Sequence, residues 1–395
     1  MHKKPKLLLL SNLFPYPPDG GGGILFCYKF IEYLRADFDI SIVCFVVSSE
    51  VPHIGIMSDM CINGIFIEKP KNKLLRKIIS IFSLTPSSIS KFKSRIFQDQ
   101  VFKLVKNEKF DIAFTYGIGM EQFLKEVNIP VISAPIDAMS LLFKRRSEHI
   151  PDLFKKIVFL WESWRLKRYE INTMSLSALC FVVSEVDNEY FKKNGIKNSF
   201  YSTNGVDSSY FRPQNEAKNF SIIFTGVMDY PPNIDAATYM ASEVMPLLAI
   251  KYPNIKYFVV GRNPTAEIKE LASDNIVVTG YVEDVRRYIS RASVYVSSLR
   301  YGTGIKNKIL EAASMGKPIV ATSISLEGLK YLHPLVLEAN YPEEIVRQIS
   351  RILDNKKLAD RLGIELREET EKHYGWEATF DVIKYEIYKL INIKK

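Results

Sequence analysis

The sequence has little cysteine and no long apolar run. Its four cysteines, Cys27, Cys44, Cys61 and Cys180, form no CxxC pair and lie in apolar segments. This pattern indicates buried thiols of a reducing compartment and not a disulfide framework or a zinc site. No stretch approaches the ~18 apolar residues that a membrane-spanning helix needs. The first residues resemble a secretion signal, with lysines followed by leucines, but they run into prolines without a cleavage site. We therefore expect a cytoplasmic protein whose membrane contact is peripheral.

The fingerprints of several nucleotide and metal sites are missing as well. The four glycines Gly20–Gly23 lack the GxGxxG spacing of dinucleotide-binding proteins, and no Walker lysine follows them. Asp37 and Asp39 have the DxD spacing of metal-dependent transferases, but nothing else supports a metal, and the five histidines show no ligand spacing. We expect neither a metal nor a cofactor.

The sequence does have the composition of an ordinary globular protein, with an uneven distribution of charge. Hydrophobic residues make up 47% and charged residues 25% of the 395 residues, and this length suggests two or three domains. The net charge is +9. Residues 1–200 hold 28 basic and 20 acidic side chains, whereas residues 201–395 hold 25 and 24. A basic excess in one half predicts an anionic partner there: nucleic acid, a membrane surface or a phosphorylated substrate.

Short apolar runs alternate with helical patterns, which predicts an α/β fold of parallel sheets buried on both faces. The pattern restarts after Pro213, so we expect two doubly wound domains, 1–205 and 206–375, joined where turn residues cluster. A helical region, 359–390, should break at Tyr374–Gly375. The expected strands are 7–11, 40–46, 64–67, 112–115, 131–134 and 179–183, then 221–225, 255–260, 276–279, 294–297 and 319–322.

A similar turn follows the first expected strand of each domain. FPYPPDGGGG precedes a helix expected over 24–34, and MDYPPNID occupies the same place in the second domain, so Asp19 or Asn233 could begin a helix. Gly20–Gly23 remove side chains from the helix entrance, which lets backbone amides approach an anion. A flexible turn of small residues is the alternative.

A second glycine-containing turn, YGTGIKNKILEAASMGKP, carries two lysines and a glutamate. Lys306 and Lys308 at the start of a helix oppose its dipole, so stability alone would not select them, whereas glycine amides and two lysines suit a diphosphate. Glu311 lies on about the same helix face as Lys308, and a carboxylate beside a phosphate site is typical of ribose binding. A solvated basic turn is the alternative.

This segment resembles the donor-binding segment of the retaining glycosyltransferases of family four, which have the GT-B fold. ILEAASMGKPIVAT is similar to the family's LEAMAxGxPVVAT, and FPYPPDGGGG, STNGVDSSYFRP, VVGRNP and VTGYVEDVRRYISRASVYVSSL are similar to its other segments. The likeness is greatest to bacterial sugar transferases of surface-polysaccharide assembly. It implies two Rossmann-like domains facing across a cleft, an acceptor-side domain first and a nucleotide-sugar domain second, with the carboxyl-terminal helix 376–395 returning to the first.

The resemblance also implies a role for each candidate residue. Lys306 and Lys308 would hold the diphosphate of a UDP or GDP sugar, Glu311 its ribose, and Arg262 would line the nucleotide. The other donor contacts would come from Gly21, Gly22 and Gly23 facing the sugar phosphate across the cleft, from Gly280, Tyr281 and Val282 at the base, and from the turn residues Gly302, Thr303, Gly304 and Ile305. Thr303 stands where the family has a glutamate, so the contacts near the sugar should differ.

The implied reaction is transfer to a lipid-linked or glycan acceptor with retention of configuration and without a covalent intermediate or a metal. Asp137 is the expected acceptor-side carboxylate, and its alternative role is to cap the following helix. A nucleotide-sugar epimerase or hydrolase of the same fold and a dinucleotide-dependent oxidoreductase are the competing functions. An epimerase or hydrolase would need a cluster of carboxylates or histidines around the cleft segments, and an oxidoreductase would need a GxGxxG motif. The sequence has neither.

The basic excess of the first domain gathers on two amphipathic helices expected near 71–103. Such helices can lie in a membrane interface, so we expect an anionic membrane, at the inner face of the cell membrane, as a partner. The alternative is that both helices pack on their own sheet with a solvated basic side. The basic residues are not interleaved with aromatic ones, so we do not expect nucleic acid.

Overall fold

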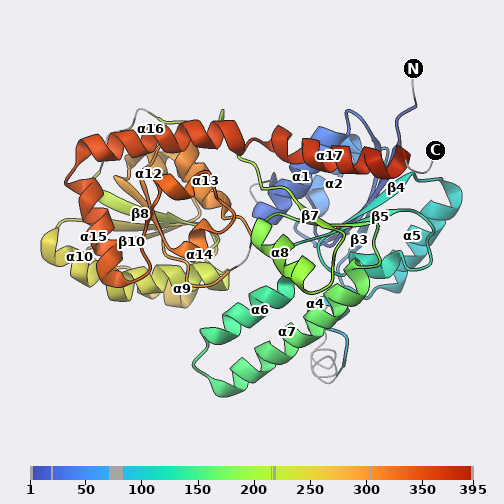
Figure 1. Ribbon diagram of the computed structural model, residues 1–395, viewed down its shortest axis with the longest axis horizontal. Helices are drawn as coiled ribbons and strands as arrows, with labels where there is room; N and C mark the ends of the chain where they lie inside the picture. The colour runs from blue at the N-terminus through green and yellow to red at the C-terminus, as the bar shows by residue number, and fades with distance from the viewer. Residues whose placement is uncertain are drawn as a thin grey trace. The chain divides into compact units, whose positions relative to one another are not determined.

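The computed structural model describes residues 3–18, 21–70, 83–214, 216, 219–302 and 304–392. The chain divides into two compact units, Met1–Ser202 with Thr379–Lys395 (unit 1) and Thr203–Ala378 (unit 2). Each unit is one parallel sheet with helices packed on it (Figure 1). The alternation of apolar runs and helical patterns predicted this α/β architecture, and it is confirmed.

Unit 1 contains a seven-stranded sheet in the order β3-β2-β1-β4-β5-β6-β7. Leu7–Leu10 of the central strand β1 are completely buried, because both faces of a parallel sheet are covered. The expected strands are present with ends moved by one or two residues. Only β7 was not expected, since three residues are too few to show a pattern. The strands are β1 Lys6–Ser11, β2 Asp39–Val46, β3 Asn63–Glu68, β4 Ile112–Tyr116, β5 Val131–Ile136, β6 Leu179–Val182 and β7 Ser199–Tyr201.

Two sets of helices cover the faces of this sheet. On one face, Phe97 and Val101 of α5 pack into a cluster with Phe45 of β2. On the other, Phe30 of α1 packs on Phe114 of β4, and Phe380 of the carboxyl-terminal helix α17 packs on Phe30, so the end of the chain belongs to unit 1 (Figure 1). The helices of this unit are α1 Gly22–Leu34, α2 Ile54–Met60, α4 Ser87–Ser90, α5 Arg95–Asn107, α6 Met139–Glu148, α7 Leu153–Met174, α8 Glu185–Lys193 and α17 Trp376–Asn392, with the 3₁₀ turns η2 Val51–His53 and η3 Met120–Phe123.

Unit 2 contains a six-stranded parallel sheet in the order β10-β9-β8-β11-β12-β13. The expected strands are again present, and the two-residue β13 is additional. Its strands are β8 Ser221–Thr225, β9 Lys256–Val260, β10 Ile276–Gly280, β11 Val294–Ser297, β12 Ile319–Ala321 and β13 Leu337–Glu338. Its helices are α9 Pro231–Tyr239, α10 Met245–Lys251, α11 Ala266–Glu270, α12 Val285–Arg291, α13 Asn307–Ser314, α14 Ser323–Leu326, α15 Pro342–Leu353 and α16 Lys356–His373, with a π-helical turn η4 Met240–Val244 and a 3₁₀ turn η5 His333–Leu335.

The predicted helix break at Tyr374–Gly375 is confirmed, because α16 ends at His373 and α17 begins at Trp376. The strand order of each unit reverses at one place, between β1 and β4 in unit 1 and between β8 and β11 in unit 2. Such reversals open a crevice at the carboxyl ends of the two strands, where ligands of doubly wound folds bind. Among the described residues, no helix is both long and apolar enough to cross a membrane.

Candidate functional site

The reversal point of unit 2 brings together residues from three segments. Gly226 follows β8, α9 begins five residues later, and the turn after β11 leads into α13. Lys308 of α13 donates a hydrogen bond from Nζ to Asn233 Oδ1 of α9 (2.5 Å), and the same ammonium lies 4.4 Å from the centre of the Phe224 ring. Asn233 in turn donates from Nδ2 to the carbonyl oxygen of Val227 (2.9 Å). These contacts join α13 to the loop after β8.

Asn233 does not begin a helix, which corrects the sequence prediction. Helix α9 starts at Pro231 after Tyr230, and Asn233 is its third residue. Proline suits the first helical position because it has no N–H that would need a partner there. The asparagine side chain is therefore available to bind Lys308. A buried polar residue one turn into a helix gives no pattern in the sequence, so its contact with Lys308 was not predicted.

Burial sets the protonation of the two titratable groups on α13. Desolvation lowers the pKa of Lys308 to about 7, partly offset by the nearby Glu311 carboxylate, while Lys306 lowers it further. Desolvation also raises the pKa of Glu311 to about 7, and Lys308 partly offsets that shift. A lysine whose charge is penalised by burial is stabilised when an anion arrives, because the anion restores the preference for the charged form. The start of α13 thus has the electrostatics of an anion site.

The second lysine closes the turn that leads into this helix. Lys306 is the N-cap residue of α13 and is buried, and its Nζ donates to the carbonyl oxygen of Gly304 (2.6 Å). Gly304 has a φ of +68°, a conformation that favours glycine. Gly302 lies beside Lys306, and Ile305 packs into the core of unit 2. Thr303 lies outside the described residues.

Close backbone contacts connect the remaining predicted donor residues to this place. The loop after β9 crosses the loop after β8 so tightly that a Cβ on Gly261 would lie 1.7 Å from the carbonyl oxygen of Gly226. The amide of Gly261 donates to the carbonyl oxygen of Gly280 at the end of β10 (3.2 Å), and the carbonyl oxygen of Arg262 accepts from Met228 (2.9 Å). The ends of β8, β9 and β10 are thereby held in contact.

The two residues after Gly280 differ in exposure. Tyr281 is largely exposed, and Val282 packs against the core of unit 2. Unit 2 therefore places Arg262, Gly280, Lys306, Lys308 and Glu311, all predicted from the sequence, around one set of strand ends.

Gly21–Gly23 lie at the corresponding reversal point of unit 1, whereas Asp19 and Gly20 lie outside the described residues. Gly21 is the N-cap of α1 with a φ of 130°, and Gly22 is the first helical residue. The carbonyl oxygen of Gly23 accepts from the hydroxyl of Tyr116 (2.7 Å), the last residue of β4. The amide of Asn12, just after β1, donates to the carbonyl oxygen of the same tyrosine (3.1 Å). Tyr116 thus ties the helix entrance to both strands.

Asp137 follows an unusual backbone conformation at the end of β5. Ile136 has a φ of +76°, which is rare for a β-branched residue and typical of functional or tightly constrained positions. The N-cap of α6 is Ala138, so the alternative that Asp137 is the capping residue is wrong. The first amides of α6 are bound instead by carboxylates of other helices, Ala138 N to Asp187 Oδ1 (3.3 Å) and Ser140 N to Glu170 Oε1 (3.0 Å).

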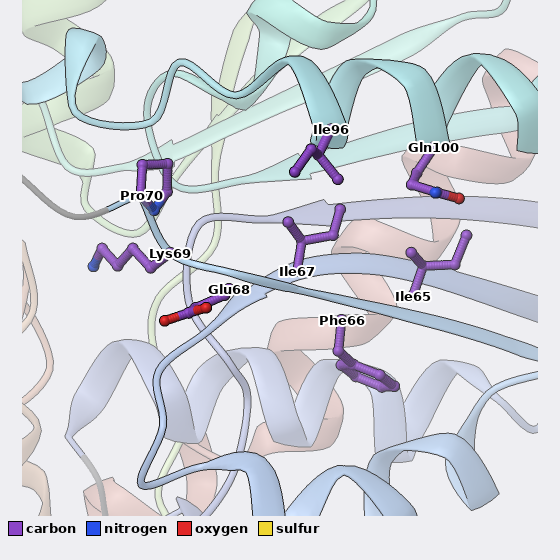
Figure 2. Close-up of a pocket in the computed structure, with 8 residues that line it drawn as sticks. All are labelled: Ile65, Phe66, Ile67, Glu68, Lys69, Pro70, Ile96 and Gln100. Atoms are coloured by element: carbon purple, nitrogen blue, oxygen red, sulfur yellow. The ribbon is translucent and has the colours of Figure 1, made fainter.

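The predicted basic helices near 71–103 are described only in part. Residues 71–82 lie outside the described residues. Helix α5 buries Phe97, Val101 and Leu104 against its own sheet, as the alternative interpretation expected, so its apolar face is occupied within unit 1. An open depression of about 540 Å³ lies between α5 and the edge strand β3. Figure 2 shows Ile65 and Ile67 of β3 pointing toward α5 and Phe66 pointing to the other face. None of the predicted site residues lines this depression.

Within the described ranges, no group of three or more His, Cys, Asp or Glu side chains is arranged to hold a metal ion. His373 stacks on Tyr331 with ring centres 3.7 Å apart. Asp39 is the first residue of β2.

Part of the chain matches a known protein family. Residues 219–355, most of unit 2, match the model of a family described as glycosyl transferases group 1. A 44.6 kDa protein of the cps region of Klebsiella pneumoniae is 21% identical over 386 residues, covering 90% of this chain and 93% of the relative. A glycosyltransferase of Methanocaldococcus jannaschii is 26% identical over 147 residues, 34% of this chain and 37% of the relative.

Solved structures resemble nearly the whole chain. Sucrose-phosphate synthase from Thermosynechococcus elongatus aligns with a TM-score of 0.74 at 16% identity, covering 99% of this chain and all of the other. HepE of Anabaena in complex with UDP-glucose aligns with a TM-score of 0.69 at 12% identity, covering 97% and 99%. The chain therefore has the GT-B fold of these glycosyltransferases, and its second unit carries the segment that matches glycosyl transferases group 1.

Proposed function

We propose that this protein is a retaining glycosyltransferase that moves a sugar from a nucleotide-diphosphate donor to a lipid-linked or glycan acceptor during assembly of a bacterial surface polysaccharide such as a capsule or O-antigen. The observation that carries this proposal is the partly buried Lys308, bound to Asn233 beside Glu311 at the reversal point of unit 2. The match of residues 219–355 to glycosyl transferases group 1 supports it.

In the proposed reaction, unit 2 binds the donor and stabilises the leaving diphosphate. Lys306 and Lys308 neutralise the charge that develops on the diphosphate as the bond to the sugar breaks, and this interaction is strengthened because Lys306 is buried and Lys308 is partly buried. Glu311 accepts hydrogen bonds from the ribose hydroxyls. Backbone groups of Gly280, Tyr281 and Val282 contact the base, and Arg262 lines the nucleotide. Gly302, Gly304 and Ile305 lie beside the diphosphate.

Unit 1 would supply the acceptor side. We propose that Asp137, held just after the strained Ile136, faces the acceptor, and that the amides at Gly21–Gly23 bind a phosphate. The nucleotide is proposed to be uridine or guanosine diphosphate. HepE of Anabaena, which resembles this chain in fold, is described in complex with UDP and with UDP-glucose. The relative from the cps region of Klebsiella pneumoniae supports the role in polysaccharide assembly.

Thermal unfolding with candidate ligands tests the proposal directly. A nucleoside diphosphate at about 100 times its dissociation constant should add roughly 2.7 kcal/mol to the free energy of unfolding, which shifts the midpoint visibly. UDP, GDP and ADP should be compared with NAD and with an oligonucleotide. Stabilisation by NAD or the oligonucleotide alone would overturn the proposed function in favour of an oxidoreductase or a nucleic-acid-binding protein.

Variants of Lys308 make the test specific to the site. Because burial lowers the pKa of Lys308, the folded state disfavours its charge, so Lys308→Met should raise the midpoint without ligand and abolish both the ligand shift and sugar transfer. Lys317 is the control, since it is a buried lysine of the same unit that donates to the carbonyl oxygens of Ser290 and Ala292. Lys317→Met should lower the midpoint and keep the ligand shift. A Lys308→Met protein that still responds to UDP or GDP would show that the donor site is misplaced.

A further inference from the structure

Helices α6 and α7 of unit 1 form a hairpin in which the two helices pack against each other. Figure 1 shows the two helices side by side, with their connecting turn directed away from the strands of that unit. Ser163 Oγ of α7 donates to the carbonyl oxygen of Ser140 on α6 (2.7 Å), and the Phe143 and Phe159 rings stack at 5.5 Å. On the same side, Arg165 pairs with the buried Glu162. These contacts fix which side of α7 faces inward.

The opposite side of α7 presents a continuous apolar stripe to solvent. The exposed residues recur at the spacing i, i+1, i+4, i+7, i+8 and i+11, which places them on one helix face. Phe154 is 76% and Ile157 57% exposed, values that an isolated surface residue can have but that a row of six seldom has. Two of the three tryptophans of the chain belong to the stripe and stack on each other at 4.9 Å. Its members are Leu153, Phe154, Ile157, Leu160, Trp161 and Trp164.

Basic side chains outnumber acidic ones on the surface of the hairpin that carries this stripe. The guanidinium of Arg168 lies 4.9 Å from the Trp164 ring, so the charge and the aromatic face are adjacent. Glu162 and Arg165 are buried together and do not contribute to the surface. The exposed or half-buried acidic residues of the hairpin are Glu148 and Asp152. The exposed or half-buried basic residues of the hairpin are more numerous: Lys144, Arg145, Arg146, Lys155, Lys156, Lys167 and Arg168.

From this arrangement we infer that α7 docks on an anionic lipid bilayer, lying in the interface with its apolar stripe among the acyl chains and its basic side chains against the headgroups. Tryptophan, phenylalanine and leucine on one face with lysine and arginine around it are the features of helices that bind membranes in this way. This surface on α7 is not the one that the sequence suggested near 71–103. The apolar face of α5 in that region packs against its own sheet.

A second copy of the chain is a less suitable occupant. A twofold contact through this surface would bring the basic side chains of the two hairpins together, which costs free energy because like charges repel. An anionic bilayer supplies the complementary charge over the whole hairpin, at about 1 kcal/mol per basic residue near the surface. This inference rests on the proposed function in one respect: membrane binding would bring the enzyme to a lipid-linked acceptor.

Vesicle co-sedimentation of the full chain tests this inference. Wild-type protein should bind vesicles of phosphatidylglycerol and phosphatidylethanolamine, bind phosphatidylcholine vesicles weakly, and lose binding as salt rises. Its tryptophan emission should shift to the blue, because two of three tryptophans enter the interface. Phe154→Ser with Ile157→Ser should weaken binding by at least about tenfold.

The control is a pair of equally exposed apolar residues elsewhere. Ile364 is 60% and Ile250 81% exposed, and both belong to unit 2. Ile364→Ser with Ile250→Ser should bind vesicles like the wild type. Equal binding by both double variants, or no blue shift, would overturn the inference. So would a wild-type dimer that becomes monomeric in Phe154→Ser with Ile157→Ser while vesicle binding is unchanged, because a second copy then covers the stripe.

The nucleotide assay separates this inference from the proposed function. Both double variants keep the donor-site residues, so their midpoints should shift with UDP or GDP as in the wild type. Loss of vesicle binding with an intact nucleotide response supports the membrane surface. A protein that binds vesicles but no nucleotide would leave the membrane surface standing and refute the transferase.

Discussion

Glu121 shows how burial alone can change the chemistry of a single residue. Its side chain is nearly inaccessible, with Oε1 accepting from the Thr115 hydroxyl (3.0 Å) and Oε2 from the Gly119 amide (2.9 Å). Desolvation outweighs these hydrogen bonds and raises the pKa to about 7. Glu170, which binds the start of α6, has a pKa raised to about 7 for the same reason. Both residues belong to unit 1, whereas the proposed donor site belongs to unit 2, so such shifts alone do not identify catalysis.

The raised pKa of Glu121 predicts a pH-dependent stability of unit 1. The folded state binds the proton more tightly than the unfolded state, so stability is lost as pH rises from about 4.5 to about 7. Replacing Glu121 with Gln removes this loss, which amounts to roughly 3 kcal/mol for a shift of this size. The unfolding midpoint of Glu121→Gln should therefore exceed that of the wild type at pH 8 and approach it at pH 5.

The exposed Glu126 provides the comparison for this measurement. Glu126→Gln should follow the wild-type midpoint at both pH values. If the unfolding midpoint of Glu121→Gln differed from that of the wild type by the same amount at pH 5 and at pH 8, the pH dependence could not be assigned to Glu121.

The loops after β8 and β9 illustrate how pairs of elements build the candidate site. Gly261 can lie against the carbonyl oxygen of Gly226 only because it has no side chain, and this approach holds the loop that leads to Asn233. The space at Gly226 is also limited, since a Cβ there would lie 2.7 Å from Asn233 Nδ2 and 3.0 Å from Lys308 Nζ. The lysine contact thus depends on two glycines from different loops.

Gly261→Ala should disturb both stability and the donor site. The added methyl group overlaps a backbone atom that cannot move without moving β8, so we expect a loss of several kcal/mol and a weaker shift with UDP or GDP. Gly55 in α2 is the control, because a Cβ there meets nothing within 4 Å, and Gly55→Ala should stabilise by about 0.5–1 kcal/mol. Unchanged unfolding of Gly261→Ala would contradict the close approach of these loops.

The whole molecule is organised so that unit 1 is completed by the end of the chain. Phe380 of α17 packs on Phe26 (5.3 Å), Phe30 (6.0 Å) and Tyr33 (5.6 Å), and it is completely buried. Tyr33 also donates from its hydroxyl to Asp381 (2.6 Å). Because these partners lie near the beginning of the chain, unit 1 closes only after unit 2 has been synthesised.

Loss of the α17 contacts should therefore destabilise unit 1. Phe380→Ala removes a buried aromatic ring and should cost about 3–5 kcal/mol in the free energy of unfolding. Tyr385 lies on the exposed side of the same helix, and Tyr385→Ala should change stability little. Chemical denaturation followed by circular dichroism measures both. Equal stability of the two variants would mean that α17 is not part of the core of unit 1.

Local patterns predicted most of the fold because its causes are local. Strands such as 7–11 and 221–225 are apolar throughout, since a parallel sheet is covered on both faces, and this leaves a signal in a few consecutive residues. The two strands that were not expected, β7 and β13, are only three and two residues long. Lys306, Lys308 and Glu311 could be grouped for the same reason, because all three lie within seven residues of Gly304.

The sequence by itself determined most of the strands, the two sheets, the helix break at Tyr374–Gly375 and the grouping of Lys306, Lys308 and Glu311 around the start of α13. Only the tertiary structure decided that Asn233, 75 residues away, binds that lysine, and that α5 buries its apolar face while α7 exposes one. An apolar helix face requires burial somewhere, but which surface covers it depends on neighbours that are distant in the chain. Hydrophobic burial is non-directional. A sequence pattern therefore predicts that an apolar helix face will be buried, but the tertiary structure decides which surface covers it.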